Sequence, residues 1–302
     1  MNRPTILVTG REGQVGWELS RTLAPLGHVV ALSRREVDLT NARQVRDALR
    51  TFKPALIVNP AAYTAVDKAE SDLVTARAVN AIAPAVMAEE ACTLGATLIH
   101  YSTDYVFDGI KAAPYLETDA TNPLNAYGQT KLEGEQALTA SGAHHLCLRT
   151  SWVYGARGGN FMRTIMRLAQ EREELKIVAD QIGAPTWSRL VAEATAQIVA
   201  QRWAQDRDGL ADVSGIYHLT AAGETSWFGY ASAILDGLHL LPGWENKRLA
   251  TLLPIPSNEY PVPAKRSPYS VMSNQKLQET FHLTLPDWHF SLQQVLAGLV
   301  VN

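Results

Sequence analysis

The first half of the sequence alternates short apolar runs with stretches of helical pattern, and this alternation limits the fold more than any other feature. Apolar runs of strand length lie at 5–8, 28–32, 55–58, 97–102 and 145–151. Helical patterns lie between them, near 14–26, 41–51, 68–94 and 125–140. Strands that alternate with helices form crossover units, whose helices cover both faces of a parallel sheet. The sequence therefore predicts an α/β fold with a doubly wound parallel sheet.

The regular pattern ends near Tyr154. Prolines then become frequent toward the C-terminus, as in the stretch 252–268. This change of texture predicts a sheet domain at 1–154 and a smaller, less regular lobe at 155–302. The segment GIYHLT (215–220) reads as a further strand that can return to the first sheet. We expect the two lobes to be partly interleaved.

Composition and charge limit the kinds of partner. The 302 residues are 46% apolar and carry a net charge of −3, so no overall field recruits nucleic acid or an anionic membrane. Small molecules are the expected partners. The only cysteines, Cys92 and Cys147, cannot form a disulfide framework, and no run of eighteen apolar residues is present. The sequence predicts a cytoplasmic protein.

The first apolar run leads directly into a glycine-rich loop. The loop reads TGREGQVG, with Gly10, Gly13 and Gly16 ahead of a helical pattern. Glycines at such a turn let backbone N–H groups and the helix N-terminus approach a pyrophosphate closely. Because the loop follows the first strand of an alternating pattern, it predicts a Rossmann-type dinucleotide site.

The end of the second apolar run indicates which dinucleotide is bound. A carboxylate there holds the ribose of NAD, whereas a cation holds the 2′-phosphate of NADP. This chain has Ser33, Arg34 and Arg35, with Glu36 and Asp38 close behind. A charge-assisted contact to phosphate contributes about 1.5–3 kcal/mol. The two arginines favour NADPH as the cofactor, with NADH as the alternative.

A tyrosine and a lysine stand four positions apart in AYGQTK (126–131). Of the ten tyrosines, only Tyr127 is followed by a lysine at this spacing. On a helix, Tyr127 and Lys131 share one face. A cation within about 4–6 Å lowers the pKa of a phenol by about 1–3 units. We expect Tyr127 to be the proton donor to a forming alkoxide, and Lys131 to bind the ribose of the cofactor as well.

Hydroxyl groups follow the fourth apolar run. The stretch HYSTDYVFDG places Ser102, Thr103 and Asp104 where that strand ends. Ligands of doubly wound sheets bind beyond the carboxyl ends of the strands. A hydroxyl at this point can bond a substrate carbonyl and take part in proton transfer. Thr103 is the expected third catalytic residue.

Seven segments, spread over nearly the whole chain, carry a resemblance to a known family. They are TGREGQVG (9–16), VNPAAYTAVDKAE (58–70), HYSTDYVFDG (100–109), PLNAYGQTKLEGE (123–135), RTSWVYG (149–155), DQIGAPT (180–186) and PVPAKR (261–266). The chain resembles the extended short-chain dehydrogenase/reductases and, within them, the dTDP-4-dehydrorhamnose reductase family. The resemblance implies NAD(P)H-dependent reduction of the 4-keto group of dTDP-4-dehydro-β-L-rhamnose. The product, dTDP-L-rhamnose, is a precursor of cell-surface polysaccharides such as lipopolysaccharide.

The resemblance also implies roles for individual residues. Those that contact the cofactor are Gly13, Gln14 and Val15 at the pyrophosphate, Asp38 and Leu39 at the adenine, and Ala62, Tyr63 and Thr64 at the inner half. Those that act on the substrate are Thr103 and Asp104 at the sugar, Tyr127 as proton donor with Lys131, Trp152 in the pocket wall, and Arg266 at the nucleotide diphosphate.

The resemblance does not extend to a metal site. Some family members bind magnesium through carboxylates at a subunit interface, and Glu18 matches one of these positions. Arg189 stands where a second carboxylate is expected, and a cation cannot replace a magnesium ligand. We predict no metal site and leave monomer and homodimer open.

Three other functions fit the same framework. A sugar-nucleotide dehydratase needs an additional acid–base pair, commonly Asp-Glu after the hydroxyl residue, where this chain has Asp104 and Tyr105. An epimerase needs tightly retained NAD, which Arg34 and Arg35 disfavour. A non-catalytic, NADP-binding regulatory subunit shares the fold, but Thr103, Tyr127 and Lys131 are all retained here. The residues favour reduction.

Overall fold

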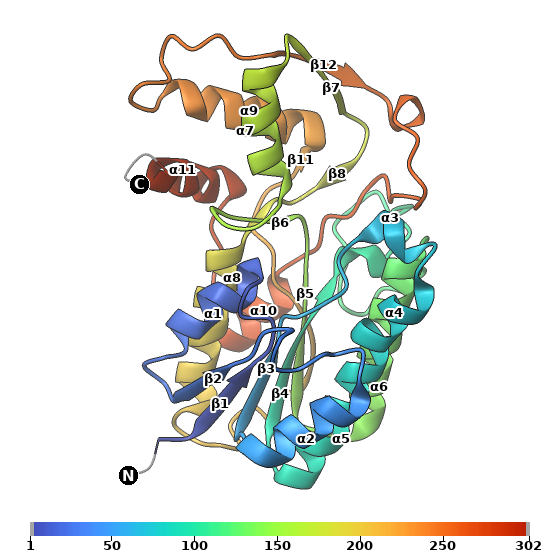
Figure 1. Ribbon diagram of the computed structural model, residues 1–302, viewed down its shortest axis with the longest axis vertical. Helices are drawn as coiled ribbons and strands as arrows, with labels where there is room; N and C mark the ends of the chain where they lie inside the picture. Colours follow the sequence, from blue (N-terminus) through green and yellow to red (C-terminus); the bar gives the residue numbers. More distant parts are fainter. Residues whose placement is uncertain (1–2, 300–302) are drawn as a thin grey trace.

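A parallel six-stranded sheet forms the centre of the larger lobe in the computed structural model, which describes residues 3–299 (Figure 1). The strand order is β10-β5-β4-β3-β1-β2, and every neighbouring pair is parallel. In chain order the strands are β1 (Thr5–Val8), β2 (His28–Ala31), β3 (Leu56–Asn59), β4 (Thr97–Thr103), β5 (His145–Thr150) and β10 (Gly215–His218). This architecture confirms the predicted doubly wound fold.

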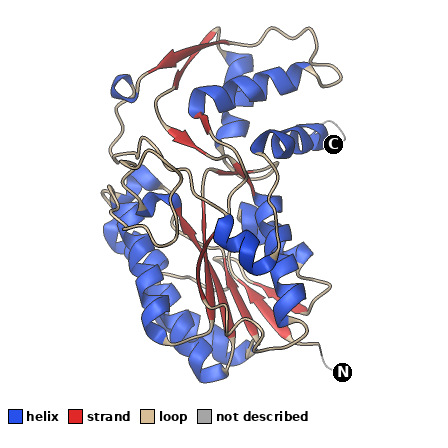
Figure 2. Cartoon of the chain, turned by 180° about the vertical axis from the view of Figure 1, so that it is seen from behind, coloured by secondary structure: helices blue, strands red, loops and turns tan. Residues whose placement is uncertain are grey.

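Helices cover both faces of this sheet (Figures 1 and 2). One face packs against α1 (Gln14–Thr22) and α8 (Ser188–Ile198), through side chains such as Val8 and Ile99. The other face packs against α2 (Ala42–Phe52), α5 (Ala83–Leu94) and α6 (Ala126–Ser141), through side chains such as Leu7 and Leu98. Because strands buried on both faces need apolar side chains at every position, these strands appear in the sequence as continuous apolar runs.

The long helix expected near 68–94 is interrupted. The structure has α3 (Val66–Ala69), α4 (Leu73–Arg77), a π-helical turn η1 (Ala78–Ile82) and then α5. In the π-helical turn, the Asn80 side chain accepts a hydrogen bond from the backbone N–H of Tyr63, at 2.8 Å. Such turns commonly lie beside functional sites, and this one supports the loop that carries Tyr63.

The smaller lobe is built from short elements of the second half of the chain. Its helices are α7 (Phe161–Glu171), α9 (Trp227–His239) and α11 (Trp288–Leu299). Its paired strands are β7 (Glu174–Val178) with β12 (Thr251–Ile255), β8 (Ile182–Gly183) with β11 (Thr225–Ser226), and β6 (Val153–Tyr154) with β9 (Thr186–Trp187). Side chains of Tyr154, Tyr230 and Trp288 continue the apolar core from the α1/α8 face into this lobe.

Polar side chains at the N-cap begin several helices. A side-chain oxygen accepts a hydrogen bond from the first turn of α2, α6, α7 and α9, at Asn41, Asn125, Asn160 and Ser226. Such caps stabilise a helix by about 0.5–2 kcal/mol. The remaining helical segments are η2 (Asp104–Val106), η3 (Val199–Trp203), η4 (Ser257–Glu259) and α10 (Gln275–Phe281). Within residues 3–299, no helix combines the length and the hydropathy that a membrane span requires.

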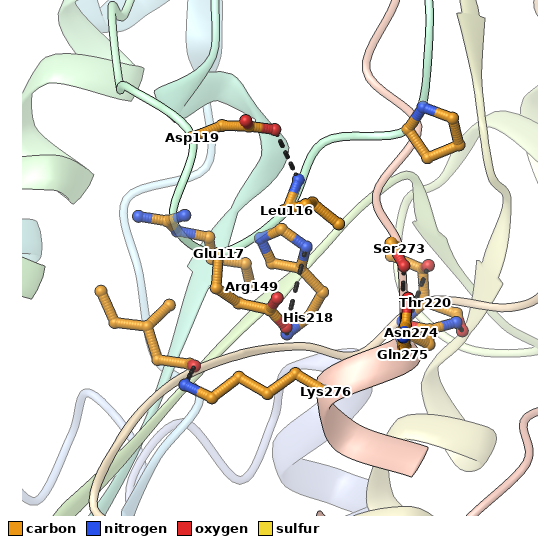
Figure 3. A network of polar contacts seen from close by, with 12 residues as sticks. Leu116, Glu117, Asp119, Arg149, His218, Thr220, Ser273, Asn274, Gln275 and Lys276 are labelled. Atoms are coloured by element: carbon orange, nitrogen blue, oxygen red, sulfur yellow. Dashed lines mark hydrogen bonds and ion pairs between the residues drawn. The ribbon is translucent and has the colours of Figure 1, made fainter. Parts of the chain in front are cut away.

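The edge strand β10 returns from the second half of the chain to the first sheet. It pairs with β5 in parallel register, with His218 beside Arg149. Figure 3 shows the contacts that hold it: the Lys276 ammonium donates to the Ile216 carbonyl at 2.7 Å, and the Glu117 carboxylate accepts from the His218 backbone N–H at 2.9 Å. Residues distant in sequence thus complete the sheet, while the division at residue 154 stays a prediction.

Candidate active site

The glycine loop places a helix N-terminus at the carboxyl end of β1. Gly10 has a φ of 62°, in the region that favours glycine, and its carbonyl accepts from the Gly13 N–H at 2.9 Å. A Cβ atom on Gly16 would lie 2.1 Å from the Gly10 oxygen, so only glycine allows this close packing of helix on loop. The α1 helix begins at Gln14 without a side-chain cap. Its first backbone N–H groups are therefore left for an anionic ligand.

A cavity of about 380 Å³ lies beside this loop, at the ends of β1, β2 and β3. Seven of the predicted cofactor residues line it, namely Gly10, Ser33, Arg34, Asp38, Leu39, Ala62 and Tyr63. Lys68, Asp72 and Thr75, which the sequence had not singled out, line it as well. The cavity has the position and size of a dinucleotide half-site.

Other predicted cofactor residues lie outside the cavity lining. They are Gly13, Gln14, Val15, Gly16, Arg35, Thr64, Tyr127 and Lys131. Arg35 and Thr64 are exposed to solvent. The side chain of Gln14 is directed toward the second lobe, where its oxygen accepts from Asn160 at 2.9 Å. Gln14 thus connects the glycine loop to the segment that follows β6.

The acidic group that follows the arginines is held away from the cavity. Glu36 accepts hydrogen bonds from the hydroxyl and the backbone N–H of Ser33, and pairs with Arg11 at 2.8 Å. The Ser33 hydroxyl, followed by its backbone N–H, lowers the pKa of Glu36 below its usual value. Arg34, by contrast, lies in the cavity wall; the Thr40 backbone N–H lowers the pKa of Asp38, and the charge of Arg34 adds a smaller contribution in the same direction. Arg34 and Lys68 are both cations in the cavity wall, and Arg34 is the one at the end of β2.

Tyr127 lies in the first turn of α6, against the end of β4. The Thr103 side chain lies close enough to the Tyr127 phenol to lower its pKa, and the Tyr127 ring meets Tyr105 edge to face, with centroids 5.4 Å apart. A Cβ atom on Gly128 would lie 2.2 Å from the Tyr105 carbonyl oxygen, so glycine lets α6 approach η2 closely. The two predicted hydroxyl groups therefore meet, and a substrate oxygen can contact both.

The prediction that the pKa of Tyr127 is lowered is wrong for this structure. Burial raises this pKa to about 12, and the nearby Thr103 side chain offsets only part of the shift. The physical reason lies in Lys131, whose side-chain nitrogen contacts the Tyr101 carbonyl at 2.6 Å and His100 Nε2 at 3.1 Å. Lys131 is itself buried, and desolvation lowers its pKa to about 8.

A much smaller cavity, of about 20 Å³, lies on the substrate side of Tyr105. Three predicted substrate residues line it, namely Asp104, Trp152 and Arg266. Trp152 has a φ of 45° and stacks on Trp227, with ring centroids 3.5 Å apart. Arg266 forms a two-pronged ion pair with Asp67, with N–O distances of 2.8 and 2.9 Å. The structure thus brings these residues together around a nearly closed space.

Asp104 is a buried carboxyl group in the wall of this cavity. Burial raises its pKa to about 6, although hydrogen bonds from Ser270 and Thr103 oppose the shift. The Thr103 hydroxyl donates to Asp104 at 3.1 Å. Because this carboxyl group changes its charge near neutral pH, it can accept a hydrogen bond from a sugar hydroxyl or give one to it.

Comparison with known proteins agrees with this geometry. A family model described as RmlD substrate binding domain matches residues 4–301. A dTDP-4-dehydrorhamnose reductase of Burkholderia thailandensis is 53% identical over 291 residues, covering 95% of this chain and 96% of the relative. The chain belongs to the dTDP-4-dehydrorhamnose reductase family. The predicted family is confirmed.

Solved structures of the dTDP-4-dehydrorhamnose reductase family have the same fold. The protein of Clostridium acetobutylicum has a TM-score of 0.88 and 35% identity, covering 98% of this chain and 99% of that one. The protein of Bacillus anthracis, solved in complex with NADP, has a TM-score of 0.85 and 32% identity, with the same coverage. The similarity spans both lobes.

Sequence reasoning missed several residues of this dTDP-4-dehydrorhamnose reductase family member. His100 and Asn59 contact each other at 3.0 Å beneath Lys131, and Trp227, Gln181 and Ser270 line the substrate-side cavity. A signal existed for His100, because strand alternation puts it on the same face as Ser102. No local pattern marked Trp227, whose contact with Trp152 joins residues 75 positions apart.

The predicted absence of a metal site stays a prediction. Burial raises the pKa of Glu18, while the nearby charge of Arg189 acts against that shift. Arg189 pairs with Glu193 at 2.7 Å, within α8. In the part of the chain that the structure describes, no three His, Cys, Asp or Glu side chains are grouped to hold a metal ion.

Proposed function

We propose that the protein reduces the 4-keto group of dTDP-4-dehydro-β-L-rhamnose to give dTDP-L-rhamnose, with NADPH as the preferred reductant. The observation that carries this proposal is that Thr103 and Tyr127 lie next to each other, at the end of β4 in a chain of this reductase family. Two hydroxyl groups that meet at the carboxyl edge of the sheet can both contact one carbonyl oxygen.

The cofactor fits the residues present, because Gly10 and Gly16 leave the space that side chains would otherwise fill. Gly13, Gln14 and Val15 would hold the pyrophosphate, Arg34 the 2′-phosphate, and the residues at 38–39 and 62–64 the rest of the molecule. When bound, NADPH supplies the hydride that adds to the carbonyl carbon.

Tyr127 would give its phenolic proton to the oxygen at C4 as the carbonyl becomes an alcohol. A pKa of about 12 keeps this phenol protonated over the whole physiological pH range, so Tyr127 always holds a proton that it can donate. Thr103 would hold the same oxygen through a second hydrogen bond. Lys131 would assist by binding the cofactor ribose and, when protonated, by stabilising the tyrosinate that proton transfer leaves behind.

The substrate would enter between the two lobes, against Asp104, Trp152 and Arg266. We propose that residues 1–154 mainly bind the dinucleotide and that residues 155–302 mainly bind the nucleotide sugar. The small cavity beside Trp152 is far below the usual 300–1,000 Å³ of a ligand site. Opening of the Arg266–Asp67 pair would free the guanidinium for a diphosphate, with which arginine forms two-pronged hydrogen bonds.

The expected partner is a small nucleotide sugar, with no nucleic acid, membrane or bound metal involved, and the chain acts as a monomer or a homodimer. Two free cysteines support a reducing, cytoplasmic location. Dehydration is disfavoured because Tyr105 occupies the place of the additional carboxylate, and the chain's acid–base groups suffice for reduction.

The test is the loss of NADPH absorbance when purified protein meets dTDP-4-dehydrorhamnose that is generated in the assay. Turnover, with a 4-hydroxy sugar as product, is expected. Parallel assays with NADH and with the UDP sugar define the strictness of both choices. Binding of NADPH without turnover would contradict the reductase proposal and favour the regulatory alternative, whereas conversion of the sugar without net oxidation of cofactor would favour elimination or epimerisation.

A further inference from the structure

A row of buried polar side chains crosses the sheet beneath α6. Thr9 follows β1, Asn59 ends β3 and His100 lies in β4, where Asn59 and His100 are register partners. The three are no more than 4% exposed, on a face that is otherwise packed with Leu7, Ile57 and other apolar side chains. Polar groups buried in this way must find their partners in one another.

The hydrogen bonds along this row have a definite direction. The Ala61 N–H donates to Thr9 Oγ1 at 3.4 Å, and the Thr9 hydroxyl donates to Asn59 Oδ1 at 2.6 Å. The Asn59 amide nitrogen then faces His100 Nδ1 at 3.0 Å. An amide nitrogen only donates, so Nδ1 accepts, and a neutral ring carries its hydrogen on Nε2. The orientation of Thr9 therefore fixes the tautomer of His100.

The Nε2 atom faces the side-chain nitrogen of Lys131, at 3.1 Å. Complete burial, followed by the charge of Lys131, lowers the pKa of His100 well below its usual value, so the ring is neutral. Its Nε2–H is thus aimed at a nitrogen that can accept only as a neutral amine. The same nitrogen of Lys131 donates to the Tyr101 carbonyl. Lys131 is held between one donor and one acceptor.

We infer that His100 is a positioning residue, which fixes the side-chain nitrogen of Lys131 and stabilises its neutral form through the Nε2–H donor. This role rests on the proposed function, because it concerns the lysine that assists Tyr127 there. A protonated amine has no lone pair for this hydrogen, so uptake of a proton releases Lys131 from His100. The lysine is then free to turn its hydrogens toward the ribose hydroxyls of the cofactor.

The ionisable groups nearest to Lys131 are either paired with an opposite charge or uncharged. Glu135, one turn along α6, forms a buried ion pair with Arg149 at 2.6 Å. Burial raises the pKa of the Cys147 thiol, which therefore stays uncharged. The other titratable side chains on elements packed against α6 are Tyr101 on β4, His145 on β5, Asp104 and Tyr105 on η2, Asp67 and Lys68 on α3, Arg77 on α4, and Glu89, Glu90 and Cys92 on α5. Arg77 pairs with Glu133, and Glu90 pairs with Arg46 and Arg50.

Two substitutions of His100 distinguish the effect of losing the Nε2–H donor from the effect of losing the imidazole ring itself. His100→Gln places an amide N–H near the position of Nε2, and so keeps a donor for Lys131. His100→Asn reaches only the position of Nδ1, so it keeps the contact with Asn59 and loses the donor. Burial lowers the pKa of Lys131 to about 8, and the donor acts in the same direction. Loss of one neutral hydrogen bond corresponds to an upward shift of about half a unit to one unit in the pKa of Lys131.

The experiment measures NADPH affinity by fluorescence from pH 6 to 10, together with kcat/KM for the sugar nucleotide. Affinity is expected to fall as Lys131 loses its proton, with the midpoint moved upward in the Asn variant and not in the Gln variant. Equal midpoints in both variants, moved or unmoved, would overturn the role of His100. The pH dependence of NADPH affinity tests the role of His100 without any turnover of substrate. Failure of the reductase assay alone would therefore contradict only the proposed function.

A second measurement does not require either variant to fold. The ¹⁵N spectrum of histidine-labelled native protein is expected to show His100 as the neutral ring with its hydrogen on Nε2. The signal is assigned in the native protein through its scalar connection to the assigned backbone of His100. A hydrogen on Nδ1, or a ring that titrates in this range, would overturn the inference.

Discussion

The cofactor cavity and the substrate-side cavity differ in size and in origin. The cofactor cavity has a volume of about 380 Å³ and is lined by segments 9–10, 32–40 and 61–79, which belong to successive strand–helix units. The substrate-side cavity measures about 20 Å³ and collects side chains from five separate parts of the chain, between residues 104 and 270. The cofactor cavity, built by neighbouring strand–helix units, is open. The substrate-side cavity, assembled from distant segments, is nearly closed.

The closed state has identifiable contacts. Trp152, Trp227 and Arg266 line the substrate-side cavity, where the two rings stack on each other and Arg266 pairs with Asp67. Each contact joins segments more than 70 residues apart. Under the proposed function, binding of substrate exchanges these contacts for contacts to the ligand, so substrate affinity is expected to depend on their stability.

The largest expected effect separates chemistry from cofactor binding. Tyr127→Phe removes the proton donor, and kcat is expected to fall by about 100- to 10,000-fold. NADPH affinity should stay near that of the parent, because the cofactor cavity is lined by other residues. Steady-state kinetics and cofactor titration check both parts. Tyr154→Phe, at a core tyrosine, is the control and should keep its activity; parental kcat in the Tyr127 variant would refute the assignment.

The next effect concerns the stability of the substrate side. The pKa of Asp104 is raised to about 6 in the folded protein, against 3.8 for the unfolded chain. Ionised Asp104 therefore destabilises the fold, fully above pH 6 and not at all below pH 3.8. Asp104→Asn is expected to raise the free energy of unfolding at pH 8 by up to about 3 kcal/mol, and the gain should vanish toward pH 4.

Urea denaturation at both pH values measures this effect. Asp119→Asn is the control of opposite sign, because the ion pair with Lys111 lowers the pKa of that carboxyl group. It should lose stability at pH 8. A loss for the Asp104 variant at pH 8 would show that its carboxylate is stabilised rather than strained in the fold.

A smaller effect tests the open cavity. Arg34→Ala removes the cation from the cavity wall, and NADPH affinity is expected to fall about ten- to a hundredfold, with little change for NADH. Arg35→Ala is the matched control, since Arg35 is exposed and outside the cavity lining. Fluorescence titration of both cofactors distinguishes the two variants. Equal losses of affinity for NADPH and NADH would mean that Arg34 does not bind the 2′-phosphate.

The smallest effect tests the closed cavity. Asp67→Asn removes the carboxylate that holds Arg266 in the free protein, so KM for the sugar nucleotide is expected to fall about two- to fivefold. Glu193→Gln breaks a comparable surface ion pair, with Arg189, and should leave KM unchanged. A rise of KM in the Asp67 variant would indicate that this carboxylate orients Arg266 for binding instead of competing for it.

The same contrast explains how much the sequence could predict. The parallel sheet and the glycine loop follow from patterns within 10 to 20 residues, and both were predictable. The π-helical turn at residues 78–82 was not, and the contact of Asn80 with Tyr63 that accompanies it joins residues 17 positions apart. The raised pKa of Tyr127 and the contact between His100 and Lys131 depend on packing of α6 on β4. Spacing along the chain does not reveal how deeply a pair is buried.

The return of β10 to the first sheet has a consequence for protein synthesis. When the first 154 residues leave the ribosome, β5 still has an unpaired edge, and such an edge can pair with other chains. The strand that covers it is made some 60 residues later, and the lysine of α10 that anchors this strand comes later still. The nucleotide-binding sheet is therefore completed only when most of the polypeptide has been made.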